Sequence, residues 1–108
     1  MLSREERIQI ANTIIEQMGG AARLKLMIGA KTFTALDCGL GFFFGACRKA
    51  NHVDIVLDPS DTYTMKFCLA GRKIRAVKEF EGLYFDQLQE VFSEYTGLIL
   101  EVPRFGRA

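Results

Sequence analysis

The sequence lacks tryptophan and has only one histidine, two prolines and three cysteines among its 108 residues. The cysteines, Cys38, Cys47 and Cys68, form no C-x-x-C pair, and together with His52 they do not match the usual ligand spacings of a zinc site. An odd number of cysteines without a secretory segment is typical of reduced thiols in a cytosol. We therefore expect no disulfide framework, no metal site and no bound cofactor.

Long apolar runs are also missing. No stretch approaches the roughly 18 apolar residues that span a bilayer, and the opening residues Met-Leu-Ser-Arg-Glu-Glu lack the apolar segment of a signal peptide. We therefore expect no membrane partner and a cytoplasmic location.

The chain has no strong excess of charge. Its formal net charge of +1 argues against a strongly basic coat for nucleic acid. Its hydrophobic content of 49% and charged content of 25% are close to globular averages, which argues against disorder. This length fits one domain, and we expect one over residues 1–108 with a loosely attached tail from about residue 100.

Helical patterns occupy both ends of the chain. Ser3 and Glu6 have the spacing of a capping box. Apolar residues then recur at helical spacing as far as the glycine pair 19–20, namely Ile8, Ala11, Ile14, Ile15 and Met18. A short second helix is predicted over Ala21–Met27. A final helix is predicted from about Leu83 to Gly97, with an apolar stripe of Phe85, Leu88, Val91, Phe92 and Tyr95.

Between the helices the apolar period is two, which indicates strands. The predicted strands are Thr32–Leu36, Leu40–Gly45, His52–Leu57, Tyr63–Leu69 and Arg72–Phe80, with Ala70-Gly71 as a two-residue hairpin loop. The connections are too short for parallel crossovers, so the sheet should be antiparallel. The sequence therefore predicts an α+β fold: a two-layer sandwich in which an N-terminal and a C-terminal helix pack on one face of a meander of four to five strands.

The segment from Lys66 to Lys78 is basic and contains no acidic residue. If Leu69 pairs with Arg72, Lys66 lies opposite Arg75, a like-charge pair that a bound anion would relieve. This hairpin, with Lys73 near its loop, is a candidate surface for phosphate or for an acidic protein.

The turn between Leu57 and Tyr63 supports a different interpretation of the same surface. If Leu57 pairs with Tyr63, Asp54 lies beside Lys66 and neutralises part of the row. An ordinary solvated face therefore stays open as the alternative.

The last helix carries Asp86, Glu90 and Glu94 at intervals of four residues, and no basic residue occurs between Glu79 and Glu101. This spacing places the three carboxylates on one stripe. The stripe is either a solvated outer face or a contact for a basic partner.

Three consecutive phenylalanines, residues 42–44, must point to alternating faces of a strand. Unless helices cover both sides of the sheet, one ring is left for an interface. We therefore include Phe43, with Arg48 and Lys49 in the loop that follows, among the candidate partner-binding residues. A homodimer through this run or through an exposed sheet edge is a further expectation.

His52, Asp54, Asp58 and Asp61 form the one cluster that suggests acid–base or metal chemistry. One strand and one turn rarely complete a coordination shell, and a histidine without a nearby nucleophile does not form a triad. We therefore predict no catalytic residues and no enzymatic activity.

Several short blocks resemble a family of short, uncharacterised proteins encoded by bacteriophages, prophages and other mobile elements. They are Met18-Gly19-Gly20, Gly29-Ala30-Lys31-Thr32-Phe33, Asn51-His52-Val53, Asp61-Thr62-Tyr63, Leu83-Tyr84-x-Asp86, Phe92 and Thr96-Gly97-Leu98. The chain departs from the family pattern at Leu24–Met27 and at Phe42–Phe44. The resemblance implies an accessory protein in the cytosol of a bacterial host, and it implies no activity.

Together these patterns predict a non-enzymatic accessory protein that binds a host protein or nucleoprotein complex. Inhibition of a bacterial defence or nucleic-acid-processing complex is its most concrete form. The alternative is a nucleic-acid-binding protein that uses the basic hairpin Lys66–Lys78.

Overall fold

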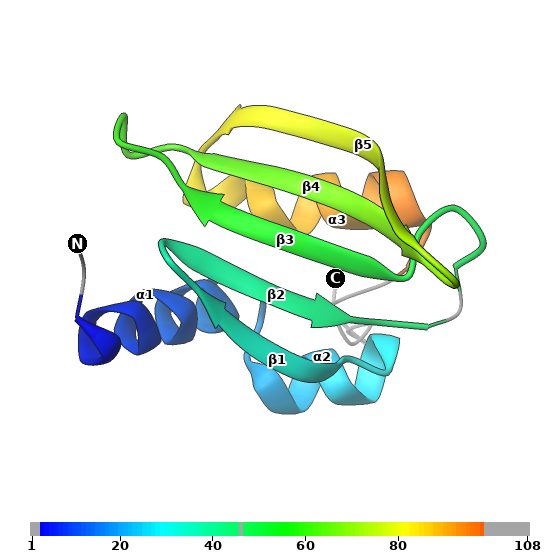
Figure 1. The fold of residues 1–108 in the computed structure, drawn as a ribbon, viewed down its shortest axis with the longest axis horizontal. Helices are drawn as coiled ribbons and strands as arrows, with labels where there is room; N and C mark the ends of the chain where they lie inside the picture. The colour runs from blue at the N-terminus through cyan, green and yellow to red at the C-terminus, as the bar shows by residue number, and fades with distance from the viewer. Residues whose placement is uncertain (1–2, 46, 99–108) are drawn as a thin grey trace, which may run out of the picture.

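The computed structural model describes residues 3–45 and 47–98. Its elements, in chain order, are α1 (Arg4–Gln17), α2 (Ala21–Ile28), β1 (Lys31–Leu36), β2 (Gly39–Phe43), β3 (His52–Leu57), β4 (Tyr63–Ala70), β5 (Ile74–Leu83), the 3₁₀ helix η1 (Phe85–Gln87) and α3 (Leu88–Thr96) (Figure 1). The loosely attached tail predicted from about residue 100 lies outside the described residues.

The strands form one antiparallel sheet in the order β1-β2-β3-β4-β5, so every neighbour in space is also a neighbour in sequence. α1 and α2 lie beside β1 and β2, and α3 lies behind β4 (Figure 1). The predicted fold class, a meander with helices at both ends of the chain, is confirmed.

The helix ends follow the local signals of the sequence. The Ser3 hydroxyl accepts a hydrogen bond from the Glu6 amide at 3.1 Å, and the Glu6 carboxylate accepts one from the Ser3 amide at 3.0 Å, which completes the predicted capping box. α2 and α3 end at Gly29 and Gly97, whose φ angles of +66° and +77° suit glycine because it lacks a Cβ.

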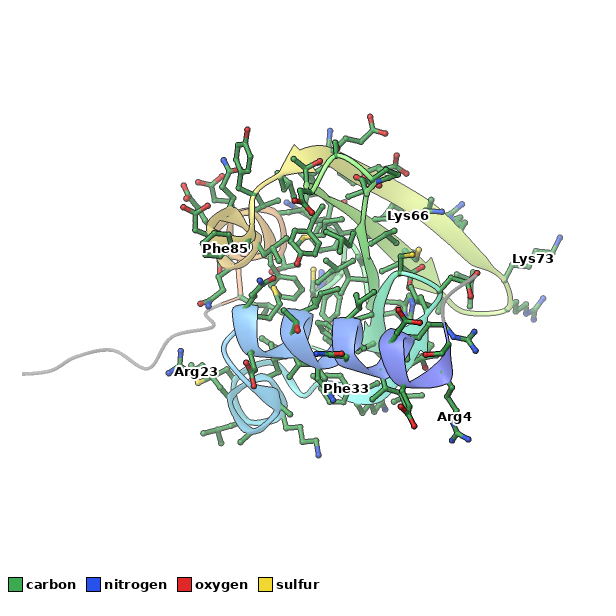
Figure 2. The ribbon with its side chains drawn as sticks, turned by 90° about the vertical axis from the view of Figure 1, so that its left-hand side faces the viewer. Arg4, Arg23, Phe33, Lys66, Lys73 and Phe85 are labelled. Carbon is green, nitrogen blue, oxygen red and sulfur yellow. The ribbon has the colours of Figure 1, made fainter. Side chains whose placement is uncertain are left out.

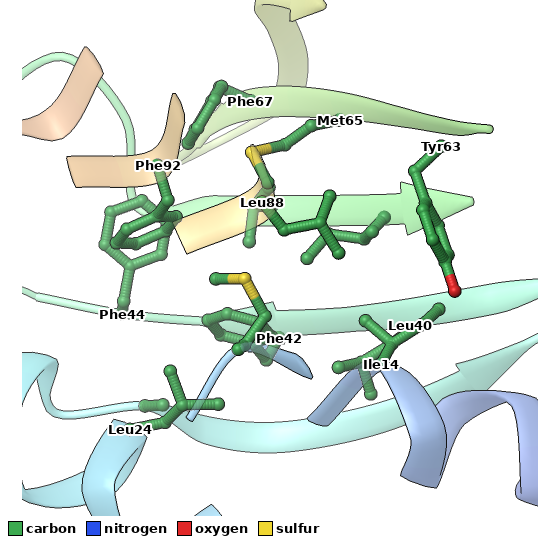
Figure 3. Close-up of a cluster of buried hydrophobic side chains, with 14 of the residues drawn as sticks. Ile14, Leu24, Leu40, Phe42, Phe44, Tyr63, Met65, Phe67, Leu88 and Phe92 are labelled. Carbon is green, nitrogen blue, oxygen red and sulfur yellow. The ribbon is translucent and has the colours of Figure 1, made fainter. Parts of the chain in front are cut away.

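One hydrophobic core lies between the helices and one face of the sheet. Phe42, in β2, and Phe44, just after it, point into this core. Phe92 of α3 packs against both, with its ring centroid 6.4 Å from that of Phe42 and 5.0 Å from that of Phe44 (Figure 3). The largest fully buried side chains are Ile14, Met18, Leu24, Leu40, Phe42, Val53, Ile55, Met65, Phe67, Leu88 and Phe92. The helices therefore cover one face of the sheet and leave the other open.

Two local predictions were wrong. Ile8, placed in the apolar stripe of α1, is 41% exposed, because it lies beside the outward-facing residues Glu5, Gln9 and Asn12, while the buried face of the helix is formed by Ala11 and Ile14. The β4–β5 loop has three residues, Gly71–Lys73, because Ala70 still pairs with Ile74. The Asn51 side chain bonds the Ala70 amide at 2.7 Å and its carbonyl at 2.9 Å, and these bonds extend β4 by one residue.

The alternation of the phenylalanine run predicts unequal effects of two otherwise identical substitutions. Phe42→Ala removes a fully buried ring and should lower the free energy of unfolding by about 3–5 kcal/mol. Phe43→Ala removes a half-buried ring on the open face and should cost about 1 kcal/mol. Urea titration followed by circular dichroism measures both; equal losses would contradict a core on one face.

Candidate functional site

The open face of the sheet carries a row of charged side chains. Asp54 pairs with Lys66 across β3 and β4, and Lys66 pairs with Glu79 across β4 and β5. The sequence placed Asp54 beside Lys66, and this is confirmed. It also placed Arg75 opposite Lys66, and this is wrong.

The cause of that error is the shape of the β4–β5 ladder. The three-residue loop and a register shift between Phe67 and Cys68 move the pairing, so that Arg75 lies opposite Leu69 instead. Lys66 therefore lies between two carboxylates, and the like-charge pair that suggested a bound anion does not exist. Lys66 is therefore not part of the basic surface.

The remaining basic groups gather near the tip of the hairpin. Arg72, Lys73 and Arg75 are all exposed, and Lys73 lies at the far end of the hairpin, on the opposite side of the view from Phe85 (Figure 2). Lys78 is also exposed, and its Nζ lies 5.4 Å from the centre of the Phe80 ring, a cation–π arrangement. The basic surface is therefore smaller than the sequence predicted.

The three residues of the predicted acidic stripe lie in two consecutive helical elements. Asp86 in η1 and Glu90 and Glu94 in α3 are all exposed, and within residues 3–45 and 47–98 none of them forms an ion pair. The three carboxylates therefore have no ion-pair partner in the described part of the chain.

Two exposed aromatic side chains lie at the start of this stripe, and sequence reasoning missed them. Tyr84 and Phe85 are each 61% exposed, although Phe85 was predicted to face the core. The reason is that η1 is a 3₁₀ turn: its tighter winding takes Phe85 off the apolar stripe that begins at Leu88.

The turn that carries these aromatics is held by two local hydrogen bonds. The Tyr84 amide donates to Oε1 of Gln87 at 2.8 Å, and the Gln87 amide donates to the Tyr84 carbonyl at 2.9 Å. A fixed backbone reduces the ordering cost when such side chains meet a partner. Large exposed aromatics with a polar surround are typical of protein interfaces.

The residues of the third predicted surface, around Phe43, have different surroundings in the structure. Phe42 and Phe44 are buried, whereas Phe43 is on the open face with its ring centre 4.5 Å from that of His52. Lys49 stabilises the end of α3, because its Nζ donates to the Tyr95 carbonyl at 3.2 Å and lies over the Tyr95 ring. Arg48 is exposed in the loop.

His52 and Asp54 form a hydrogen-bonded pair on the open face. Nε2 of His52 is 2.9 Å from Oδ1 of Asp54, and the pair lies over Gly41, where an added Cβ would be 2.6 Å from the same oxygen. Glycine at this position of β2 therefore makes room for the pair.

Cys68 lies opposite His52 in the β3–β4 ladder, a neighbour that sequence reasoning missed. The signal was present in the sequence, because the pairing that puts Asp54 opposite Lys66 also puts His52 opposite Cys68. Burial, and then the charge of Asp54, raise the pKa of the Cys68 thiol, while Lys66 acts in the opposite direction. Nδ1 of His52 is buried and has no hydrogen-bond partner among the described residues, so the thiol and the imidazole make no nucleophile–base contact there.

The two remaining aspartates of the cluster lie in the β3–β4 turn. Asp58 accepts a hydrogen bond from the Thr64 hydroxyl at 2.7 Å, and Asp61 adopts a left-handed conformation with φ of +65°. Both are ordinary features of a turn. Within the described parts of the chain, no three His, Cys, Asp or Glu side chains are grouped so that they could hold a metal ion.

Comparison with protein-family models, with curated proteins and with solved structures finds no match to this chain. Among the described residues, no helix is both long enough and apolar enough to cross a membrane.

The raised pKa of Cys68 predicts its reactivity. Because the folded protein disfavours the thiolate, Cys68 should be alkylated more slowly than the half-buried Cys38 and Cys47 at neutral pH, by at least about tenfold. For the same reason the folded state should lose stability as pH rises above the ordinary thiol pKa of about 8.5, where the unfolded thiol ionises first. Peptide mapping after timed iodoacetamide treatment measures the order, and a Cys68 that reacts first would indicate an activated nucleophile.

Proposed function

We propose that the chain is a non-enzymatic accessory protein that binds a host macromolecule through the surface formed by Tyr84, Phe85, Asp86, Glu90 and Glu94, here called the acidic–aromatic surface. The observation that supports this most is the pair of aromatic rings, each 61% exposed, at the head of a stripe of unpaired carboxylates. Exposing two large rings at consecutive positions has no benefit for folding, since their burial would stabilise the chain.

The chemistry of this surface favours a basic partner. Aromatic anchors supply most of the affinity of an interface when they are desolvated, and complementary charge around them sets the rate and the choice of partner. A basic protein surface, such as the nucleic-acid-binding face of a host complex, offers that complement. The resemblance to phage and mobile-element proteins makes inhibition of a defence or nucleic-acid-processing complex the most concrete form of the proposal.

The proposal predicts that charge reversal on α3 abolishes capture of the partner. Tagged wild-type chain, the variant Glu90→Lys/Glu94→Lys and the control Glu5→Lys/Glu16→Lys would be used to capture proteins from bacterial lysate. The control makes the same change of net charge on exposed positions of α1. We expect wild type and control to recover the same protein, and the α3 variant to lose at least about nine tenths of it.

Phe85→Ala should cause a loss of similar size, since it removes an anchor without changing charge. Recovery of the same protein by all four chains, or of none by wild type at realistic concentration, would contradict the proposal.

A second candidate function is nucleic-acid binding through the hairpin tip. The observation that favours it is the exposure of Arg72 and Lys73 in the β4–β5 loop and of Arg75 beside it in β5, at an end of the hairpin that no helix covers. With Lys66 set between Asp54 and Glu79 on the open face, the tip alone could contact about three phosphates, so binding should weaken with salt with a log–log slope of about −3.

Gel-shift titration of single- and double-stranded DNA at several salt concentrations measures this slope. Arg72→Gln/Lys73→Gln should reduce the magnitude of the slope by about two, whereas Arg23→Gln/Lys25→Gln, on the exposed surface of α2, should leave it unchanged. The absence of a salt-sensitive complex would remove this candidate.

A further inference from the structure

A pocket of about 320 Å³ lies between α1 and the turn end of the β3–β4 ladder. Four of its lining residues belong to α1 and two are the paired residues next to the turn, namely Glu6, Gln9, Ile10, Thr13, Leu57 and Tyr63. Its volume falls within the range of about 300–1,000 Å³ that is usual for small-molecule sites. None of the six residues belongs to the acidic–aromatic surface or to the hairpin tip.

The position of the pocket follows from the spacing of side chains along α1. Residues 6, 9, 10 and 13 recur at helical intervals, so they form one stripe, and Leu57 and Tyr63 lie across the pocket from it. The buried side chains of α1 are those of Ala11 and Ile14, and the helix packs mainly on β1 and β2. The stripe therefore lies at the border of the core, where the end of the β3–β4 ladder leaves room for a ligand.

The hydroxyl of Tyr63 is the clearest sign of a ligand. Tyr63 is only 6% exposed, and its ring extends from β4 toward α1, with the hydroxyl at the far end (Figure 3). A buried phenol hydroxyl usually has a hydrogen-bond partner. That of Tyr63 has none within residues 3–45 and 47–98. Because Tyr63 lines the pocket, a bound molecule can supply the missing partner.

Uncharged groups form most of the lining. Ile10 and Leu57 provide apolar side chains, and the Gln9 amide can both donate and accept hydrogen bonds. The Thr13 hydroxyl donates to the Gln9 carbonyl at 2.9 Å, which leaves it as an acceptor toward the pocket. A ligand with an apolar body and hydrogen-bonding groups matches this lining.

The charge of the pocket comes from Glu6. Its Oε1 accepts a hydrogen bond from the Ser3 amide at 3.0 Å, whereas its Oε2 has no hydrogen-bond partner in the described part of the chain. The hydrogen bond from the Ser3 amide and, to a smaller extent, one from its side chain lower the pKa of the Glu6 carboxyl, so that it is ionised at neutral pH. A cation is therefore favoured over a neutral or anionic ligand of the same shape.

We propose that this pocket binds a small organic cation whose apolar body carries a hydrogen-bonding group, such as a phenolic amine. The carboxylate of Glu6 selects the charge, the Tyr63 hydroxyl binds a polar group of the ligand, and Ile10 and Leu57 contact its apolar body. This ligand site goes beyond the function proposed above and does not depend on it.

Titration of the ¹⁵N-labelled chain with three probes tests the site. The probes share one hydroxyphenyl body: tyramine is a cation, tyrosol is its neutral analogue, and 3-(4-hydroxyphenyl)propionate is its anionic analogue. We expect tyramine to bind with a Kd of about 1 mM and to shift the amide signals of residues that line the pocket. Tyrosol should bind about threefold more weakly, and the anion at least about tenfold more weakly.

Two single substitutions and a matched control assign the contacts. Tyr63→Phe removes only the hydroxyl and should weaken the binding of tyramine at least about fivefold. Glu6→Gln, which can still complete the capping box, should weaken tyramine to the level of tyrosol and leave tyrosol unchanged. Glu5→Gln removes the same charge from the adjacent position, which does not line this pocket, and should leave the binding of both probes unchanged.

Amide shifts that are absent or that lie away from the pocket would overturn the proposal. Equal binding of the cation and the anion, or a Tyr63→Phe chain that binds tyramine like wild type, would also overturn it. If a variant fails to fold, the order of the three probes on the wild-type chain decides. These titrations use the purified chain alone, so their outcome is independent of the capture of a host partner.

Discussion

The packing of Phe92 against Phe42 and Phe44 is the contact on which the rest of the structure depends. Alternation along a strand forces residues 42 and 44 to the same side and residue 43 to the other. Once α3 covers the first two rings, the whole sheet has a helical face and an open face. The open face then has to be made compatible with water by polar side chains, and the row Asp54–Lys66–Glu79 meets that need.

This one-sided core also determines where interaction surfaces can lie. The side chains at buried positions pack in the core. The charged and aromatic side chains that stay exposed lie at the hairpin tip, on the β5 edge and in the turn before α3. A protein that acts by binding needs such surfaces and needs no pre-organised reacting groups. Burial of Cys68 raises the pKa of its thiol and so favours the neutral form.

Most of the fold could be predicted from the sequence because its signals are local. The capping box at Ser3, the glycines after each helix and the period-two runs each specify their own element, and short connections leave only an antiparallel meander. The β3–β4 register could be predicted from the turn between these strands, which pairs Leu57 with Tyr63. The β4–β5 register did not, because the bonds that extend β4 come from Asn51, a residue distant in sequence.

The candidate surfaces were predictable in part, for the same reason. The acidic stripe was predicted from helical spacing alone, whereas the exposure of Phe85 depends on a 3₁₀ turn that the sequence pattern did not predict. Lys66 was assigned to the wrong surface because the register of one ladder decides whether its neighbour is Arg75 or Glu79. Charge surfaces on sheets are therefore less predictable than those on helices.

The one-sided core is the central claim, and nuclear Overhauser contacts between aromatic protons test it most directly. We expect cross-peaks from the rings of Phe42 and Phe44 to Phe92, and from the ring of Phe43 to the imidazole of His52. Cross-peaks that join Phe43 to Phe92 would contradict the account, because they would place the opposite face of the sheet beneath the helix.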